Sequence, residues 1–147
     1  MNDTVTLRDR MRMARFVLTT SRLTQGPQVR KFEEHWSDWL GVKHSLFVSS
    51  GSTANSLLVS AWKDLNDIPD GAKVIVPACT WVTNIAPIIQ NNLTPVFCDI
   101  NLKDFSFDLG SLQTIACDNS DIRAIFVTHL LGFPAQVENF HKIFPNA

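Results

Sequence analysis

Apolar residues follow two different spacings along this chain, and the two spacings alternate. Short apolar runs rich in β-branched residues predict buried strands at residues 46–48, 74–76, 95–99 and 124–127. Apolar residues three and four positions apart predict helices at residues 29–40, 53–65, 82–90, 109–116 and 135–143. Strands that alternate with helices are typical of an α/β fold, in which helices cover both faces of a parallel sheet.

The N-terminal stretch "RDRMRMAR" clusters basic residues between apolar ones, namely Leu7, Met11, Met13 and Phe16. This mixture predicts an amphipathic helix with a solvated basic face. We favour the helix over a nucleic-acid-binding arm because no stripe of aromatic and basic residues accompanies it.

Composition excludes several classes of function. The 147 residues carry a net charge of −1, which gives no reason to expect nucleic acid or an anionic membrane as a partner. The three cysteines lack the CxxC spacing of a zinc site and are an odd number, so they indicate neither a metal centre nor a disulfide framework. No signal peptide or long apolar span is visible, and a cytoplasmic protein is expected.

Ligands of parallel α/β sheets bind beyond the carboxyl ends of the strands. That rule selects three segments here, at residues 49–53, 77–81 and 128–132. The first begins "SSGSTAN" (residues 49–55), small residues and hydroxyls between a predicted strand and a predicted helix. Such a turn presents free N–H groups and the positive end of a helix dipole, which suit a phosphate. The alternative is a tight turn in which a serine only caps the helix.

The other two segments each contain one candidate. Trp81 follows the second predicted strand, where it is either a flat wall for a stacked ring or a core residue. His129 follows the last predicted strand and has no visible partner for catalysis. The carboxylates of "CDINLKDFSFD" lack the pattern of a calcium loop, so loop and cap roles are expected for Asp99, Asp104 and Asp108.

Five motifs in order carry a family resemblance: "LTQGPQVRKFEEHW", "VSSGSTAN", "KVIVPACTWVTN", "PVFCDINLKDFSFD" and "AIFVTHLLG". Together they resemble the DegT/DnrJ/EryC1/StrS sugar aminotransferases, which are pyridoxal-phosphate (PLP) enzymes of fold type I. The resemblance implies the parallel-sheet portion of the large domain of such an enzyme. It also implies a dimer that transfers an amino group from glutamate or glutamine to a nucleotide-linked keto-sugar.

Carried over to this sequence, the resemblance implies a cofactor site. Gly51, Ser52 and Thr53 would bind the PLP phosphate, and Trp81 would stack on the pyridine ring. Thr24 and Gly26 match a turn near the substrate. His129 matches a segment in which this chain has Leu131 instead of an aromatic residue, and its role is left open.

Two groups that the family's chemistry needs do not occur in this sequence. They are an aspartate that keeps the pyridine nitrogen protonated and a lysine that forms a Schiff base with the cofactor. We therefore expect a truncated chain without a catalytic residue of its own. Residues 1–25 would form an N-terminal helix and a substrate-side turn, residues 26–147 would form part of the PLP-binding domain, and a C-terminal small domain would be absent. The partner would be a second copy or a complementing C-terminal chain.

Three alternatives stay open at this stage. "SGSTAN" and "NIAPIIQNNLTPVF" look closer to the sugar 3-dehydratases of the same family, in which a histidine replaces the lysine. A non-catalytic remnant that binds the cofactor or a sugar nucleotide is the second, and it predicts an incompletely covered sheet edge. An unrelated phosphate-binding α/β domain is the third.

Overall fold

The computed structural model describes residues 4–118 and 121–144 of the chain. The chain divides into two units, Met1–Phe47 and Val48–Ala147. None of the helices described in these ranges combines the length and hydrophobicity needed to cross a lipid bilayer.

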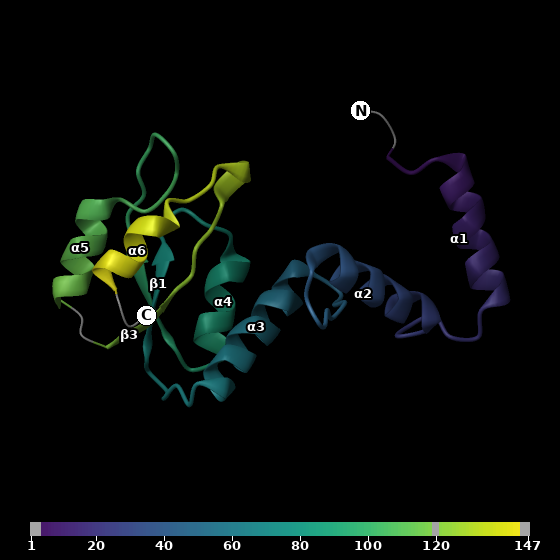
Figure 1. Ribbon diagram of the computed structural model, residues 1–147, viewed down its shortest axis with the longest axis horizontal. Coiled ribbons are helices and arrows are strands. Elements are labelled where there is room, and N and C mark those ends of the chain that lie inside the picture. Colours follow the sequence, from purple (N-terminus) through teal and green to yellow (C-terminus); the bar gives the residue numbers. More distant parts are fainter. Residues whose placement is uncertain (1–3, 119–120, 145–147) are drawn as a thin grey trace. The chain divides into compact units, whose positions relative to one another are not determined.

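A three-stranded parallel sheet forms the centre of the second unit (Figure 1). The strand order is β2-β1-β3, with β1 at Lys73–Pro77, β2 at Thr94–Cys98 and β3 at Ile122–Ile125. The central strand β1 reads KVIVP, and its last four residues are buried, as expected for a strand covered on both faces. Ile75 lies opposite Val96 of β2 and Ile125 of β3.

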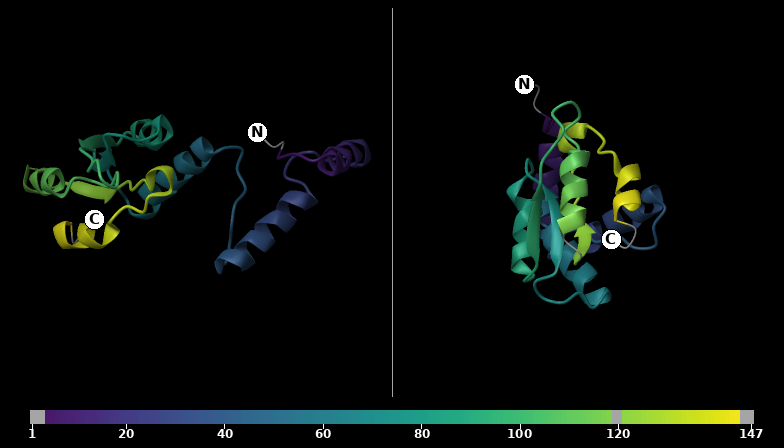
Figure 2. Two further views of the ribbon diagram at one scale, coloured as in Figure 1. Left: turned by 90° about the horizontal axis from the view of Figure 1, so that it is seen from above. Right: turned by 90° about the vertical axis from the view of Figure 1, so that its left-hand side faces the viewer.

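Helices cover both faces of this sheet. Figure 2 (left) shows α4 and α6 on opposite sides of the strands. Alternate residues of β1 enter two separate apolar clusters, because successive side chains of a strand point to opposite faces. Ile75 packs with Leu112 of α5 (Leu109–Asp118) and Phe140 of α6 (Phe140–Ile143). Val74 and Val76 pack with Val59 of α3 (Gly51–Leu65) and Ile88 of α4 (Val82–Gln90). The α/β class expected from the sequence is confirmed.

The first unit contains two helices, α1 (Leu7–Thr19) and α2 (Pro27–Leu40). Helix α1 begins with a capping box, in which Thr6 and Asp9 each accept the other's backbone N–H. Helix α2 has Pro27 in its first turn and ends at Gly41, whose φ of 73° is a conformation that glycine adopts readily. The predicted amphipathic helix at the N-terminus is confirmed as α1, although none of its residues is buried.

The strand predicted at residues 46–48 is wrong. This segment has no regular secondary structure and pairs with no strand among the described residues, and Leu46 and Phe47 are exposed. The N–H of Phe47 donates to Oε1 of Glu33 at 2.8 Å, and its ring meets Phe32 edge to face. This apolar run therefore contacts α2 through Phe47 and does not pair with a neighbouring strand.

The helix predicted at residues 135–143 is mostly wrong. Only Phe140–Ile143 is α-helical, after a 3-10 turn at Val137–Asn139. Gln136 has a ψ of 75°, which is outside the helical range, and the N–H of Ala135 donates to Nδ1 of His129 at 3.0 Å. That contact directs the chain away from a helical start, whereas the apolar spacing alone suggested one.

The predicted roles of the loop carboxylates are confirmed. Oδ1 of Asp108 accepts the N–H of Ser111 at 2.8 Å in the first turn of α5, and Oδ1 of Asp104 accepts the N–H and hydroxyl of Ser106. Oδ1 of Asp99 accepts the N–H of Ile100 at 2.8 Å. These are cap and turn contacts of the kind that short acidic side chains make.

The cap at Asp108 predicts a dependence of stability on pH. Hydrogen bonds from Ser111 hold the pKa of Asp108 below its ordinary value. The carboxylate therefore stabilises the fold above the ordinary pKa of about 3.9, and this contribution is lost as the pH falls through the lowered pKa of the folded state. We expect D108N to be less stable than the unsubstituted chain at pH 6, with the gap narrowing toward pH 2. Urea titrations across this range measure it, and a gap that does not change with pH would contradict the assignment.

Candidate functional site

The first turn of α3 presents unpaired backbone donors. Ser50 caps the helix: its Oγ accepts the N–H of Thr53 at 3.2 Å and its carbonyl oxygen accepts the N–H of Ala54 at 3.0 Å. The N–H groups of Gly51 and Ser52 precede these and have no acceptor in the helix. Gly51, Ser52 and Thr53 are all exposed. With the positive end of a 15-residue helix behind them, these donors suit an anion.

The first turns of α3 and α4 lie side by side. A groove of about 320 Å³ runs between them, lined at this end by Ser52 and Thr53 of α3 and by Val82 and Thr83 of α4. Trp81 immediately precedes α4 as its N-cap residue, and 71% of its surface is exposed. Trp81 is therefore not a core residue in this structure, and its ring is accessible to a ligand.

A polar network connects the segments that follow β1 and β3. Nδ2 of Asn84 donates to Oγ1 of Thr80 at 2.8 Å and to Oγ1 of Thr128 at 3.1 Å, and the two threonine hydroxyls lie 3.0 Å apart. Oδ1 of Asn84 accepts from Nδ2 of Asn55 at 2.8 Å. The network fixes the start of α4, and with it the backbone of Trp81, to the carboxyl edge of the sheet.

Asn55 also supplies a hydrogen-bond donor that α4 lacks. Pro87 lies inside this helix and has no N–H, so the carbonyl oxygen of Thr83 lacks its usual donor four residues later. Nδ2 of Asn55 donates to that oxygen at 3.1 Å. Asn55 thus joins α3 to α4 beside the groove by satisfying two acceptors of α4.

Replacement of Asn55 by alanine is expected to lower the free energy of unfolding by about 1–3 kcal/mol, because two partly buried acceptors lose their donor. Chemical denaturation measures the loss. Q113A, on the exposed surface of α5, is the matched control and should change stability by less than about 0.5 kcal/mol. Equal effects of the two substitutions would show that the contact between α3 and α4 does not stabilise the unit.

This network was not identified from the sequence, although each member stands at a recognisable position. Thr80 and Thr128 follow strands, and Asn84 lies four residues after Thr80. Polar residues that follow two neighbouring parallel strands are a usable signal, because the carboxyl ends of such strands meet at one edge of the sheet.

The structure gives His129 a local contact: its Nδ1 accepts the N–H of Ala135 and closes the loop after β3. Thr24 and Gly26 lie in the first unit, where Thr24 is exposed and Gly26 is buried as the N-cap of α2. A Cβ at Gly26 would come within 3.0 Å of the carbonyl oxygen of Arg22, so close packing explains this glycine.

The lysines of the second unit lie away from the groove. Nζ of Lys63 donates to the carbonyl oxygen of Asn91 at 2.8 Å, and Nζ of Lys73 lies 2.9 Å from Oδ1 of Asp121 at the amino edge of the sheet. The groove between α3 and α4 has no lysine among its described lining residues.

The cysteines include one that is fully buried. Burial, helped by the charges of Asp108 and Asp99, raises the pKa of Cys98 to about 11, so its thiol stays protonated at neutral pH. Cys79 and Cys117 are free and exposed. Among the described residues, no group of histidine, cysteine and acidic side chains could hold a metal ion.

Comparison with known proteins gives one consistent result. A family model described as the DegT/DnrJ/EryC1/StrS aminotransferase family matches residues 6–146. The chain is 33% identical over 129 residues to a GDP-4-keto-6-deoxy-D-mannose 3-dehydratase of Escherichia coli. The aligned region covers 86% of this chain and 33% of that protein. It is 30% identical over 127 residues to a dTDP-3-amino-3,6-dideoxy-alpha-D-galactopyranose transaminase of Aneurinibacillus thermoaerophilus, again 86% of this chain and 33% of the relative.

The fold agrees with solved structures of such enzymes. A structure of the E. coli GDP-4-keto-6-deoxy-D-mannose-3-dehydratase with bound hydrated PLP matches with a TM-score of 0.79 and 31% identity. The match covers 92% of this chain and 35% of that one. The chain thus spans about a third of the length of the curated relatives it matches.

Proposed function

Because the chain belongs to the DegT/DnrJ/EryC1/StrS aminotransferase family, we propose that it forms the PLP-anchoring part of an enzyme that acts on nucleotide-linked keto-sugars. The observation that carries the proposal is the exposed first turn of α3 beside the start of α4. The backbone N–H groups at the start of α3 suit the phosphate group of PLP. The ring of Trp81, at the start of α4, suits the pyridine ring at the other end of the same molecule.

Each residue of the site has a proposed role. The N–H groups of Gly51 and Ser52, with the hydroxyls of Ser52 and Thr53, hold the phosphate. Trp81 stacks on the pyridine ring, and Asn84 positions Trp81 by fixing the start of α4. Bound PLP supplies an electron sink to the substrate. Thr24 and Gly26 are proposed to lie on the substrate side of the site.

We propose the same division of the chain that the motifs suggest. Residues 1–25 contribute the N-terminal helix and the substrate-side turn, and residues 26–147 are part of the PLP-binding domain. The remaining groups, including the pyridine-nitrogen aspartate and the Schiff-base lysine, would come from sequence other than these 147 residues. The proposed partner is a second copy of the chain or a complementing C-terminal chain. The location proposed for this enzyme is the cytoplasm.

Amino transfer from glutamate or glutamine to the keto-sugar is the first candidate reaction. Removal of the sugar's 3-hydroxyl group is the second candidate reaction, and one observation favours it. The chain is 33% identical to a 3-dehydratase, but 30% identical to a transaminase and 27% identical to a GDP-perosamine synthase. The residue in the position of the Schiff-base lysine would distinguish the two, because the 3-dehydratases have a histidine there.

The chain by itself is expected to be inactive. Purified protein with PLP and glutamate should leave a GDP- or dTDP-linked 4-keto-sugar unaminated, because no lysine lines the groove in the part of the chain that the structure describes. Mass spectrometry of the nucleotide sugar measures this. An aminated product formed by the chain, above a control without protein, would contradict the proposal that the catalytic groups come from elsewhere.

Trp81 provides a direct test of the proposed site. W81A should weaken binding of a PLP analogue about two- to tenfold, because stacking between rings contributes about 0.5–1.5 kcal/mol. W39A is the matched control, because Trp39 is 73% exposed and Trp81 is 71% exposed. Isothermal titration with pyridoxine 5′-phosphate measures both. Equal affinities of the two variants would show that Trp81 is not part of the binding site.

A further inference from the structure

The contact between His129 and Ala135 closes the loop after β3 and fixes the form of the imidazole ring. Nδ1 of His129 accepts the N–H of Ala135 at 3.0 Å. A neutral imidazole carries one hydrogen, so a ring that accepts at Nδ1 carries its hydrogen on Nε2. A protonated ring has a hydrogen on both nitrogens and cannot accept this bond. The loop is therefore closed in this way only while His129 is neutral.

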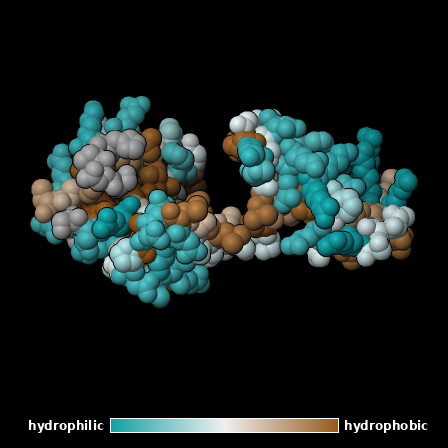
Figure 3. All heavy atoms as spheres, turned by 60° about the horizontal axis from the view of Figure 1, so that its bottom comes forward, coloured by the Kyte–Doolittle hydropathy of each residue, from teal (hydrophilic) through white to brown (hydrophobic). Residues whose placement is uncertain are grey.

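Burial of apolar side chains does little to hold the turn inside this loop. Apolar side chains of the second unit, at the left of Figure 3, reach the surface in patches, and Leu131 of the loop is 85% exposed. Leu131 also has a φ of 53°, in the left-handed region that is unfavourable for a residue with a Cβ. The closed turn therefore needs support from other contacts.

The end of the loop is anchored to the segment that follows β2. The rings of Phe133 and Phe105 have centroids 5.7 Å apart. Nε2 of Gln136 donates to Oδ2 of Asp104 at 2.8 Å. Ala135 lies between these two contacts in the chain and is buried. The N–H that His129 accepts thus belongs to the anchored part of the loop.

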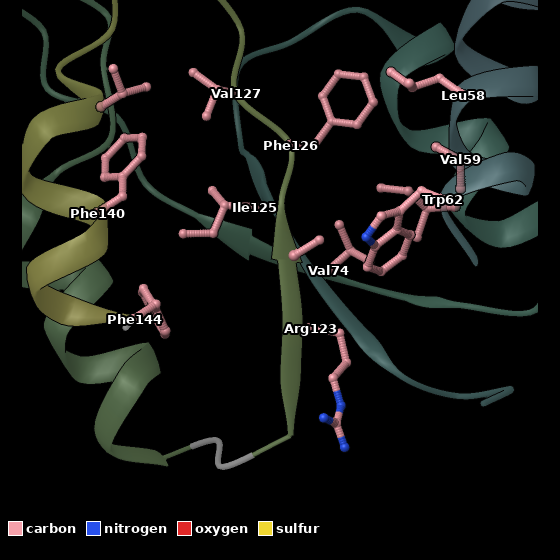
Figure 4. Close-up of a pocket in the computed structure, with 13 residues that line it drawn as sticks. Leu58, Val59, Trp62, Val74, Arg123, Ile125, Phe126, Val127, Phe140 and Phe144 are labelled. Carbon is pink, nitrogen blue, oxygen red and sulfur yellow. The ribbon is translucent and has the colours of Figure 1, made fainter. Parts of the chain in front are cut away.

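Thr128 connects the loop to the candidate cofactor site. Figure 4 shows Val127, the residue before it, on the side of the chain that faces Phe140, and both pack in one apolar cluster. Oγ1 of Thr128 accepts from Nδ2 of Asn84 at 3.1 Å, one of the bonds that fix the start of α4. Thr128 is thus held from one side by the packed end of β3 and from the other by the closed loop.

We propose that His129 is a positioning residue of the cofactor site: its neutral ring closes the loop of residues 129–135 and thereby holds Thr128 against Asn84. The inference rests on the proposed function in naming the site, but closure of the loop does not need a bound cofactor. Protonation of His129 opens the loop. The start of α4 is therefore less firmly fixed in mild acid than at neutral pH.

Other titratable side chains lie on the segments next to this loop and have to be separated from His129. The segments after β1 and β2 and the residues that follow the loop carry Cys79, Asp99, Lys103, Asp104, Asp108, Glu138, His141 and Lys142. Hydrogen bonds from Ser106 and Ser111 hold the pKa values of Asp104 and Asp108 below the ordinary value, so both stay charged between pH 5.5 and pH 7.5. Of these residue types, histidine is the one that ordinarily changes its charge in that range.

Hydrogen exchange at two pH values tests the closure of the loop. Nuclear magnetic resonance measures the protection factor of the Ala135 amide in the full chain, with the intrinsic pH dependence of exchange removed. We expect protection to fall about tenfold between pH 7.5 and pH 5.5, because the amide loses its acceptor. Equal protection at the two pH values would overturn the proposal.

Substitutions identify the group that titrates. The Oδ1 of asparagine imitates Nδ1 of histidine and accepts at either pH, so H129N should keep Ala135 protected at both. H129A lacks an acceptor and should leave it weakly protected at both. His129 is exposed, so both variants should fold. H35N replaces an exposed histidine of α2 and is the matched control, which should respond to pH as the unsubstituted chain does. The same fall in H129N would assign the effect to another group, such as His141, and overturn the proposal.

The side-chain amide of Asn84 shows whether His129 acts on the site. In the unsubstituted chain its signals should shift with the same pH midpoint as the Ala135 amide, and in H129N they should stay fixed. Asn84 signals that do not follow Ala135 would overturn the positioning role. Pyridoxine 5′-phosphate at pH 7.5 should bind H129N about three- to tenfold more tightly than H129A, and equal affinities would also overturn it. Absence of binding to every variant would contradict the proposed function, while the two readings without ligand still decide the role of His129.

Discussion

Replacing Ile75 with alanine is expected to remove a large share of the stability of the second unit. Ile75 lies in the middle of the central strand, is fully buried and packs with Leu112 and Phe140. Truncation of such a residue costs about 2–5 kcal/mol, because apolar transfer energy is lost and a cavity remains. Small domains have total stabilities of only about 5–15 kcal/mol.

Urea titration followed by circular dichroism measures the change at Ile75. I89A is the control, because Ile89 is on α4 but 58% exposed, and its substitution should cost less than about 1 kcal/mol. A loss below 1 kcal/mol for I75A as well would show that the sheet is not the centre of stability in this chain.

Replacing Ser52 with aspartate is expected to reduce phosphate binding about a hundredfold while the helix stays folded. An acidic residue in the first turn interacts favourably with the helix dipole and stabilises α3 by about 0.3–1 kcal/mol. The same carboxylate repels a phosphate dianion and removes one of its hydroxyl donors. Binding and stability therefore change in opposite directions, which separates loss of the site from loss of the fold.

Competition between inorganic phosphate and pyridoxine 5′-phosphate measures the effect at Ser52. Q113E adds one negative charge on the exposed face of α5 and serves as the control for net charge. We expect Q113E to bind like the unsubstituted chain. If Ser52→Asp binds as tightly as Q113E, the first turn of α3 is not the phosphate site. A lowered melting temperature would contradict the expected stabilisation of α3 by the helix dipole.

The positions of the main elements follow from local sequence. Helix α4 matches its predicted bounds, and β1 differs by one residue at each end, because their apolar spacing is regular and their turns carry clear signals. The failures have a common cause. Residues 46–48 and 135–143 depend on contacts with Glu33 and His129, which the spacing of apolar residues does not encode.

The candidate site was predictable only in part. Motif order identified Ser52 and Trp81 as candidates, and the structure places both at neighbouring, exposed helix starts. The supporting residues Asn55 and Asn84 were not predicted, because their role depends on how α3 and α4 pack. Pro87 was a usable sign, since a proline inside a helix leaves a carbonyl oxygen that some other group must satisfy.

The central claim is that this chain anchors a cofactor by its phosphate at the start of α3. The most direct measurement compares pyridoxine 5′-phosphate with pyridoxine by isothermal titration. Neither compound has the aldehyde of PLP, so neither can react with the surface lysines. We predict that the phosphate ester binds about a hundredfold more tightly than pyridoxine, and that inorganic phosphate displaces it. Equal binding of the two compounds, or binding that phosphate does not displace, would contradict the account.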